Sequence, residues 1–61
     1  MKIRFAHPNA YEVAFMIYAQ LGVIIIGGTM FSGEIQGNES KKNAVKKALE
    51  ESGATDITVI K

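Results

Sequence analysis

The residues best suited to chemistry are His7, Pro8 and Asn9, which follow one another near the amino end of the chain. They separate an alternating segment from a long apolar one, so we expect a strand to end and a helix to begin there. Free backbone N–H groups at a helix start stabilise negative charge, and a neighbouring histidine is a suitable anion ligand. We therefore take His7 and Asn9 as candidate anion contacts. The simpler interpretation is a loop histidine and a turn proline.

A second polar feature is a group of lysines in the segment 38–52. Glu50 and Glu51 follow the lysines, an order that opposes the helix dipole, which favours acids early and bases late. An arrangement that works against helix stability is explained if the lysines bind phosphates or an acidic protein. A solvated helix face explains it equally well. The candidate contacts for anions or nucleic acid are Lys41, Lys42, Lys46 and Lys47.

Arrangements typical of enzymes are missing from the sequence. No nucleophile or carboxylate pair has an acid–base partner at a recognisable spacing, and Gly27-Gly28 lacks the lysine and hydroxyl residue of a phosphate-binding loop. The chain has one histidine and no cysteine, which excludes the common zinc sites. We expect a protein that is not an enzyme and binds no metal or cofactor. The lack of cysteine is typical of a reducing compartment, and we expect the cytoplasm.

The strands that position these residues follow from the hydrophobic pattern. Residues 1–6 and 55–61 alternate between polar and apolar side chains, as half-buried strands do. Residues 23–26 are wholly apolar and mostly β-branched, which favours a buried strand. Gly27-Gly28 comes next and is typical of a two-residue hairpin turn, so residues 29–36 are the expected returning strand.

Two helices complete the pattern. The first, residues 10–21, is expected to begin at Asn9, whose side chain is a favourable N-cap, and to end at Gly22. The second is expected to begin after Asn38 or Ser40, either of which is a suitable cap. Its apolar stripe consists of Ala44, Val45, Ala48 and Leu49.

The resulting β-α-β-β-α-β order divides into two similar halves and predicts a single α+β domain over residues 1–61. It is typical of the ferredoxin-like fold, in which two helices cover one face of a four-stranded antiparallel sheet. One alternative is a β-meander with one helix, because residues 11–18 include strand-favouring side chains. Another is a membrane protein whose span is residues 13–31, since no charge lies between Glu12 and Glu34. Glycines punctuate that run at turn-like spacing, so we do not favour a membrane span.

Net charge and aromatic placement bear on nucleic acid as a partner. A net charge of +1 gives no strong field for phosphates. Strand alternation places Phe5 and Phe31 toward the helices, so the open face of the sheet lacks the aromatic platform on which bases stack. A weak nucleic-acid-binding protein that uses the lysine-rich helix is therefore the alternative function and not the leading one.

Association is the leading expectation. A chain of this length buries a modest core and has no disulfide to support it. Alternation along residues 23–26 points two of four apolar side chains away from the helices. We expect an interaction or regulatory module that binds its own copy or a protein partner through this open face. The mostly apolar first helix is a second candidate surface. The expected interface residues are Arg4, Ile24, Ile26, Met30 and Ile60.

Overall fold

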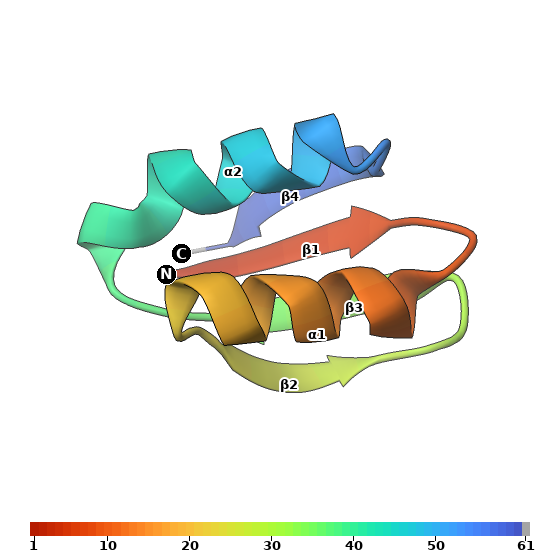
Figure 1. Cartoon of the computed structure of the whole chain (residues 1–61). Coiled ribbons are helices and arrows are strands. Elements are labelled where there is room, and N and C mark those ends of the chain that lie inside the picture. The colour runs from red at the N-terminus through yellow and green to blue at the C-terminus, as the bar shows by residue number, and fades with distance from the viewer. Residues whose placement is uncertain (61) are drawn as a thin grey trace.

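The computed structural model describes residues 1–60, and Lys61 of the last expected strand lies outside the described residues. The elements follow the expected β-α-β-β-α-β order, with a short 3₁₀ turn before the second helix. The segment 10–21 is a helix, so the ferredoxin-like arrangement is confirmed and the β-meander is wrong. The elements in Figure 1 are β1 (Lys2–Ala6), α1 (Ala10–Leu21), β2 (Ile24–Gly28), β3 (Ser32–Gln36), the 3₁₀ turn (Glu39–Lys41), α2 (Lys42–Glu51) and β4 (Thr55–Ile60).

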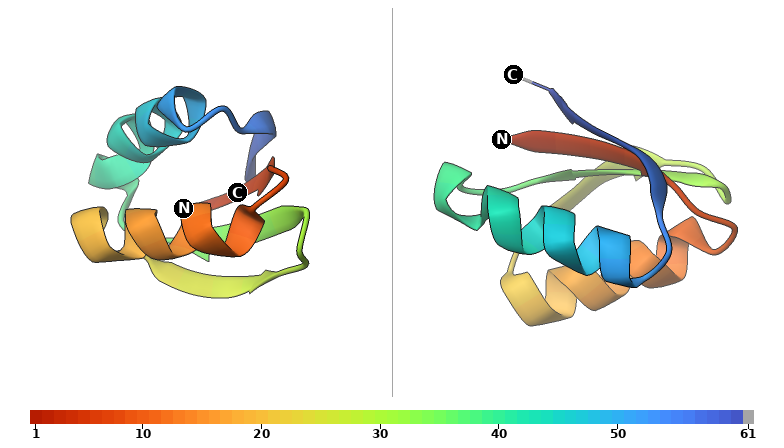
Figure 2. Two further views of the ribbon diagram at one scale, coloured as in Figure 1. Left: turned by 45° about the vertical axis from the view of Figure 1, so that its right-hand side comes forward. Right: turned by 90° about the horizontal axis from the view of Figure 1, so that it is seen from above.

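The four strands form one antiparallel sheet in the order β2-β3-β1-β4. β1 and β3 are central, whereas β2 and β4 form the two edges. Both helices cover the same face of this sheet (Figure 2). α1 contacts β2 and β3, and α2 contacts β4. The described elements leave the opposite face of the sheet uncovered.

The core lies between the helices and the covered face of the sheet. β1 and β3 contribute residues that face each other directly, Ile3 opposite Ile35. α1 contributes one helical face, because its buried positions are spaced three and four residues apart. The buried apolar residues are Ile3, Phe5, Ala10, Val13, Ala14, Ile17, Val23, Ile35, Val45 and Leu49.

The ends of α1 agree with the sequence expectation at one terminus and differ at the other. Gly22 ends the helix in a left-handed conformation, with φ of 69°, and its N–H donates to the carbonyl of Tyr18 at 2.9 Å. Asn9 occupies the N-cap position, but its side chain makes no capping hydrogen bond. The carbonyl of Met30 instead accepts from the N–H of Ala10 at 3.2 Å, so a loop satisfies part of the helix start.

The β2–β3 connection differs from the predicted hairpin. Gly27 and Gly28 are the last residues of β2, and the turn consists of residues 29–31. The hydroxyl of Thr29 accepts hydrogen bonds from the N–H groups of Phe31 and Ser32, each at 3.2 Å. This side chain stabilises a turn beyond the glycines. Phe31 therefore precedes β3 and is 65% exposed, so its expected place among the core residues is wrong.

The start of the second helix also differs from expectation. The chain first makes the 3₁₀ turn Glu39–Lys41, and neither that turn nor α2 has a side-chain cap. Asn38 and Ser40 are therefore not side-chain caps. The expected stripe is otherwise present, since Val45 and Leu49 are buried and Ala48 is half-buried, whereas Ala44 is exposed.

The β4 edge is irregular. Pairing between β1 and β4 shifts register between Arg4 and Ala6. Asp56 has a φ of 52°, a left-handed backbone conformation that non-glycine residues rarely adopt. Strand β4 therefore departs from regular extended geometry near its beginning.

The long uncharged segment is divided between α1, β2 and the turn after it. Within residues 1–60, no helix combines the length and the apolar character needed to cross a bilayer.

Candidate interaction surface

Large exposed apolar side chains gather along one flank of α1. Tyr11, Phe15 and Tyr18 are 55%, 62% and 51% exposed. They are spaced four and three residues apart, so they share one side of the helix. This flank is distinct from the buried face that packs on the sheet. A continuous aromatic stripe therefore lies exposed beside the core.

The aromatic stripe continues onto the edge strand. A shallow hollow of about 300 Å³ is lined by Phe15 and Tyr18 from α1 and by Val23, Ile24 and Ile25 at the start of β2. Figure 1 shows β2 running beside α1 at the margin of the sheet. Ile24 is 64% exposed, and Ile26 is exposed as well. We refer to Tyr11, Phe15, Tyr18, Ile24 and Ile26 together as the α1–β2 surface. Phe15, Tyr18 and Ile24 share the hollow, and Tyr11 and Ile26 are exposed further along α1 and β2.

The backbone of β2 adds an unpaired sheet edge to this surface. β2 pairs with β3 on one side and with no described strand on the other. The strand has the sequence IIIGG and carries no lysine, proline or acidic side chain. Natural edge strands usually carry such residues to prevent pairing with other chains. The strand has two irregularities, a register shift between Ile25 and Gly27 and a φ of 137° at Gly28.

The predicted open-face interface is dispersed by the strand order. Ile24 lies on β2 and Ile60 on β4, which are opposite edges of the sheet. Gln36 and Lys2 lie between them in the same row.

Arg4 and Ile26 lie in the next row of the open face, where the charged groups pair with each other. Arg4 faces Glu34, and a 3.2 Å ion pair joins their side chains. Ile26 lies at the register shift of β2, next to Gly27, which is the residue paired with Glu34. Met30 lies in the turn outside the sheet, contrary to its expected place on β3. The residues expected to form one apolar patch are therefore separated by polar ones.

The four candidate lysines also have separate environments. The ammonium of Lys41 donates to the carbonyl of Leu21 at 2.6 Å, which places a cation at the C-terminus of α1. Lys42 forms an ion pair with Glu39 at 3.6 Å. Lys46 is half-buried and Lys47 is exposed. At least two of the four lysines thus already have partners within the domain.

His7 connects two loops. Its Nε2–H donates to the carbonyl of Ser52 at 2.8 Å, and its Nδ1 accepts from the N–H of Asn9 at 2.9 Å. A carbonyl only accepts and an amide N–H only donates, so these partners select the Nε2–H tautomer. Both ring nitrogens are engaged, which leaves neither for an anion in this arrangement.

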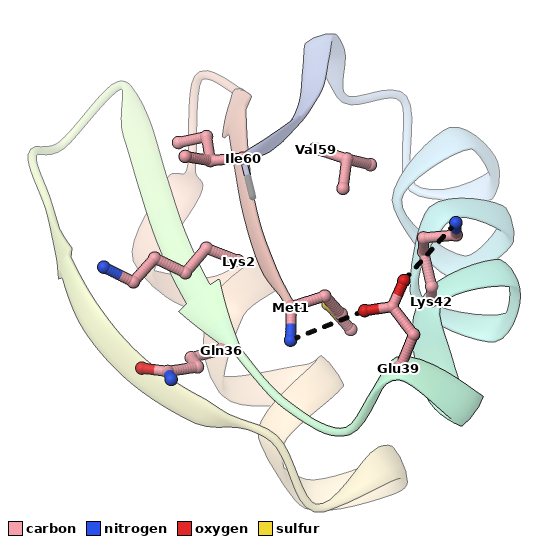
Figure 3. A pocket seen from close by; sticks show the side chains of 7 residues that line it. All are labelled: Met1, Lys2, Gln36, Glu39, Lys42, Val59 and Ile60. Atoms are coloured by element: carbon pink, nitrogen blue, oxygen red, sulfur yellow. Dashed lines mark ion pairs between the residues drawn. The ribbon is translucent and has the colours of Figure 1, made fainter.

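A second hollow, of about 400 Å³, lies where β1 begins and β3 and β4 end (Figure 3). Glu39 is its one carboxylate, and it lies 3.6 Å from the ammonium of Lys42 and 3.9 Å from the amino group of Met1. That amino group also donates to the carbonyl of Gly37 at 2.6 Å. Among residues 1–60, no second carboxylate and no histidine joins them in this lining. The residues around the hollow are Met1, Lys2, Gln36, Glu39, Lys42, Val59 and Ile60.

The described part of the chain contains no cluster of side chains arranged to bind a metal ion. No group of three or more histidine, aspartate or glutamate side chains converges there in a way that could hold a metal ion. Comparison with known proteins found no matching family model, no matching curated protein and no matching solved structure. The α1–β2 surface is therefore the strongest candidate for a functional site in the described residues.

Proposed function

We propose that this protein is a small protein–protein interaction module that associates with its own copy, and that it acts as a regulatory or accessory unit and not as an enzyme. The observation that carries the proposal is the α1–β2 surface, where aromatic and aliphatic side chains lie exposed together. Monomeric proteins seldom expose contiguous apolar patches of this kind, and those that exist are often binding sites.

Energetics favour burial of this surface. Burying one large apolar side chain contributes about 1.5–3 kcal/mol. A chain of 61 residues has a small stability margin, so an exposed group of such residues is costly for it to retain without a partner. Except for Tyr11, the surface lies within a segment that has no charge from residue 13 to residue 33. Two copies therefore meet there without electrostatic repulsion.

The other candidates have weaker support. Nucleic-acid binding would use the lysines of α2, yet Lys41 and Lys42 already have partners within the chain. Catalysis would need an acid–base arrangement, and the carboxylate of Glu39 in the hollow of Figure 3 is already paired with Lys42 and the amino group of Met1. The cysteine-free composition supports the cytoplasm as the site of action.

Sedimentation equilibrium from low to high micromolar concentration tests the proposal. We expect the native chain to associate and Phe15→Lys to remain monomeric, because a lysine at position 15 places a charge in the centre of the surface. The control is Gln20→Lys, an exposed position on the opposite flank of α1 beside Ala48 and Glu51. It adds the same charge and should associate normally. A native chain that stays monomeric at high micromolar concentration would contradict self-association.

A further inference from the structure

We infer that the second copy docks by pairing β2 with β2 of its partner, antiparallel about a twofold axis, so that the two sheets become continuous. The inference rests on the proposed function and specifies its geometry. The two copies of α1 then lie side by side on the same face of the joined sheet, with their aromatic flanks in contact. This geometry is supported by two neighbouring features, the uncharged edge strand β2 and the exposed aromatic flank of α1 beside it.

The sequence of β2 is suited to antiparallel pairing with itself. A twofold pair places one residue opposite its own copy, and a pair centred on the register shift of β2 places Ile26 there. Ile24 of one copy then lies opposite Gly28 of the other, and Ile25 lies opposite Gly27. Each of these isoleucines faces a residue without a side chain, so no pair of bulky groups collides away from the axis.

The position of α1 sets the distance between the two helices. Because α1 contacts both β2 and β3, its axis lies above the gap between them, about half a strand spacing inside β2. The twofold axis lies half a spacing outside β2. The two α1 axes are then separated by about two spacings, roughly 10 Å. Packed helices have axes about 8–10 Å apart, so edge pairing brings the flanks into contact without a shift of either domain.

The direction of α1 places the matching residues together. The N–H of Ala10, at the start of α1, bonds the carbonyl of Met30 beyond the end of β2, so the helix and the strand run in opposite directions. The twofold axis therefore makes the two helices antiparallel. Phe15, the middle residue of the aromatic stripe, lies nearest to the axis, and Tyr11 of one copy approaches Tyr18 of the other.

The area available approaches that of a standard interface. A half-exposed aromatic or large aliphatic side chain offers roughly 100 Å². The α1–β2 surface together with Met30 and Phe31, which lie beside the start of α1, offers roughly 700 Å² per copy on this basis. A standard interface buries about 800 Å² per partner. Unpaired N–H and C=O groups of β2 would add backbone hydrogen bonds across the axis.

Disulfide trapping tests this geometry, and the chain offers a clean background because it has no cysteine. Antiparallel neighbours lie about 4.5–5.5 Å apart between Cα atoms, which suits a disulfide. We expect Ile26→Cys to form a disulfide-linked dimer under mild oxidation. Lys47→Cys, exposed on α2, should stay reduced. Adding Phe15→Lys to Ile26→Cys should abolish the cross-link.

A second measurement does not depend on the cysteine variant. Amide hydrogen exchange in Ile24–Gly28 of the native chain should slow as concentration rises, because pairing protects edge amides. A dimer that Phe15→Lys dissociates, but that neither cross-links at position 26 nor protects β2, would overturn edge pairing and leave the proposed function intact. A native chain that is monomeric at high micromolar concentration would overturn both.

Discussion

The ring of Phe5 occupies the space that a side chain at position 33 would need. The two residues face each other across β1 and β3, and a Cβ atom built at Gly33 lies 2.5 Å from Cζ and 2.7 Å from Cε1 of Phe5. Phe5 is 1% exposed, so its ring has no free space into which to move. The absence of a side chain at Gly33 therefore allows the ring of Phe5, the largest core side chain, to lie over the neighbouring strand β3.

We predict that Gly33→Ala destabilises the protein by about 1–3 kcal/mol, the usual cost of overpacking a core. Urea unfolding at a concentration where the chain is monomeric would measure the loss. Gly27→Ala is the matched control, since a Cβ there meets nothing within 4 Å and the position has no positive φ. The new methyl group meets the Phe5 ring at position 33 and no other atom within 4 Å at position 27. Equal stabilities would show that the Phe5 ring yields.

Lys41 is predicted to stabilise the end of α1. Replacing it with Met keeps the aliphatic chain and removes the ammonium that bonds the carbonyl of Leu21. We expect a loss of about 1 kcal/mol in the free energy of unfolding. Lys47→Met, at an exposed position on α2, should change stability by less than about 0.5 kcal/mol. Identical effects of the two substitutions would argue against the capping role of Lys41.

His7 is predicted to hold one tautomer. Under alkaline conditions, where an imidazole is neutral, the ring ¹⁵N chemical shifts should report a protonated Nε2 and an unprotonated Nδ1. Replacing His7 with Ala removes bonds to Ser52 and Asn9 and should cost about 1–2 kcal/mol. Averaged ¹⁵N shifts typical of a free imidazole would show that these bonds do not persist in solution.

Asn9 is predicted to contribute little through its side chain. A capping asparagine is usually worth about 1 kcal/mol, but the side chain of Asn9 makes no capping bond. Asn9→Ala should therefore change stability by less than about 0.5 kcal/mol. Thr29→Val provides the contrast and should cost about 1 kcal/mol, because the hydroxyl accepts from two backbone N–H groups. A loss of about 1 kcal/mol or more in Asn9→Ala would restore the cap.

The element order could be predicted from sequence because local signals agreed with one another. Gly22 ends α1 as expected, whereas the mostly apolar sequence of this helix did not show that Val13, Ala14 and Ile17 form its buried face. The boundaries of β2 and β3 were harder to predict. A glycine pair is a strong hairpin signal, but Thr29 stabilises the turn further along the chain with its hydroxyl. Such side-chain bonds depend on geometry that a pattern of residue types does not contain.

For the expected interface residues, the sequence predicted exposure but not which residues are neighbours. Alternation correctly indicated that two of the residues 23–26 are exposed, and these are Ile24 and Ile26. It gave no information about which strands are neighbours. Because β2 and β4 are the two edges, Ile24 and Ile60 lie on opposite sides of the sheet. The spacing of Tyr11, Phe15 and Tyr18 in the sequence is enough to place them on one side of α1. That this side lies next to the edge strand β2 became evident only from the strand order.

The irregular start of β4 bears on how large an assembly can grow. Sheets with two regular free edges can add molecules end to end without limit, which is how fibres form. Both edges have a register shift, but Asp56 adds a carboxylate and a left-handed backbone to β4, whereas β2 carries no charge. Once two copies join through β2, each outer margin of the joined sheet is a β4 strand that resists further addition. An assembly built in this way is closed at two copies, which keeps an uncharged edge strand from becoming a template for polymerisation.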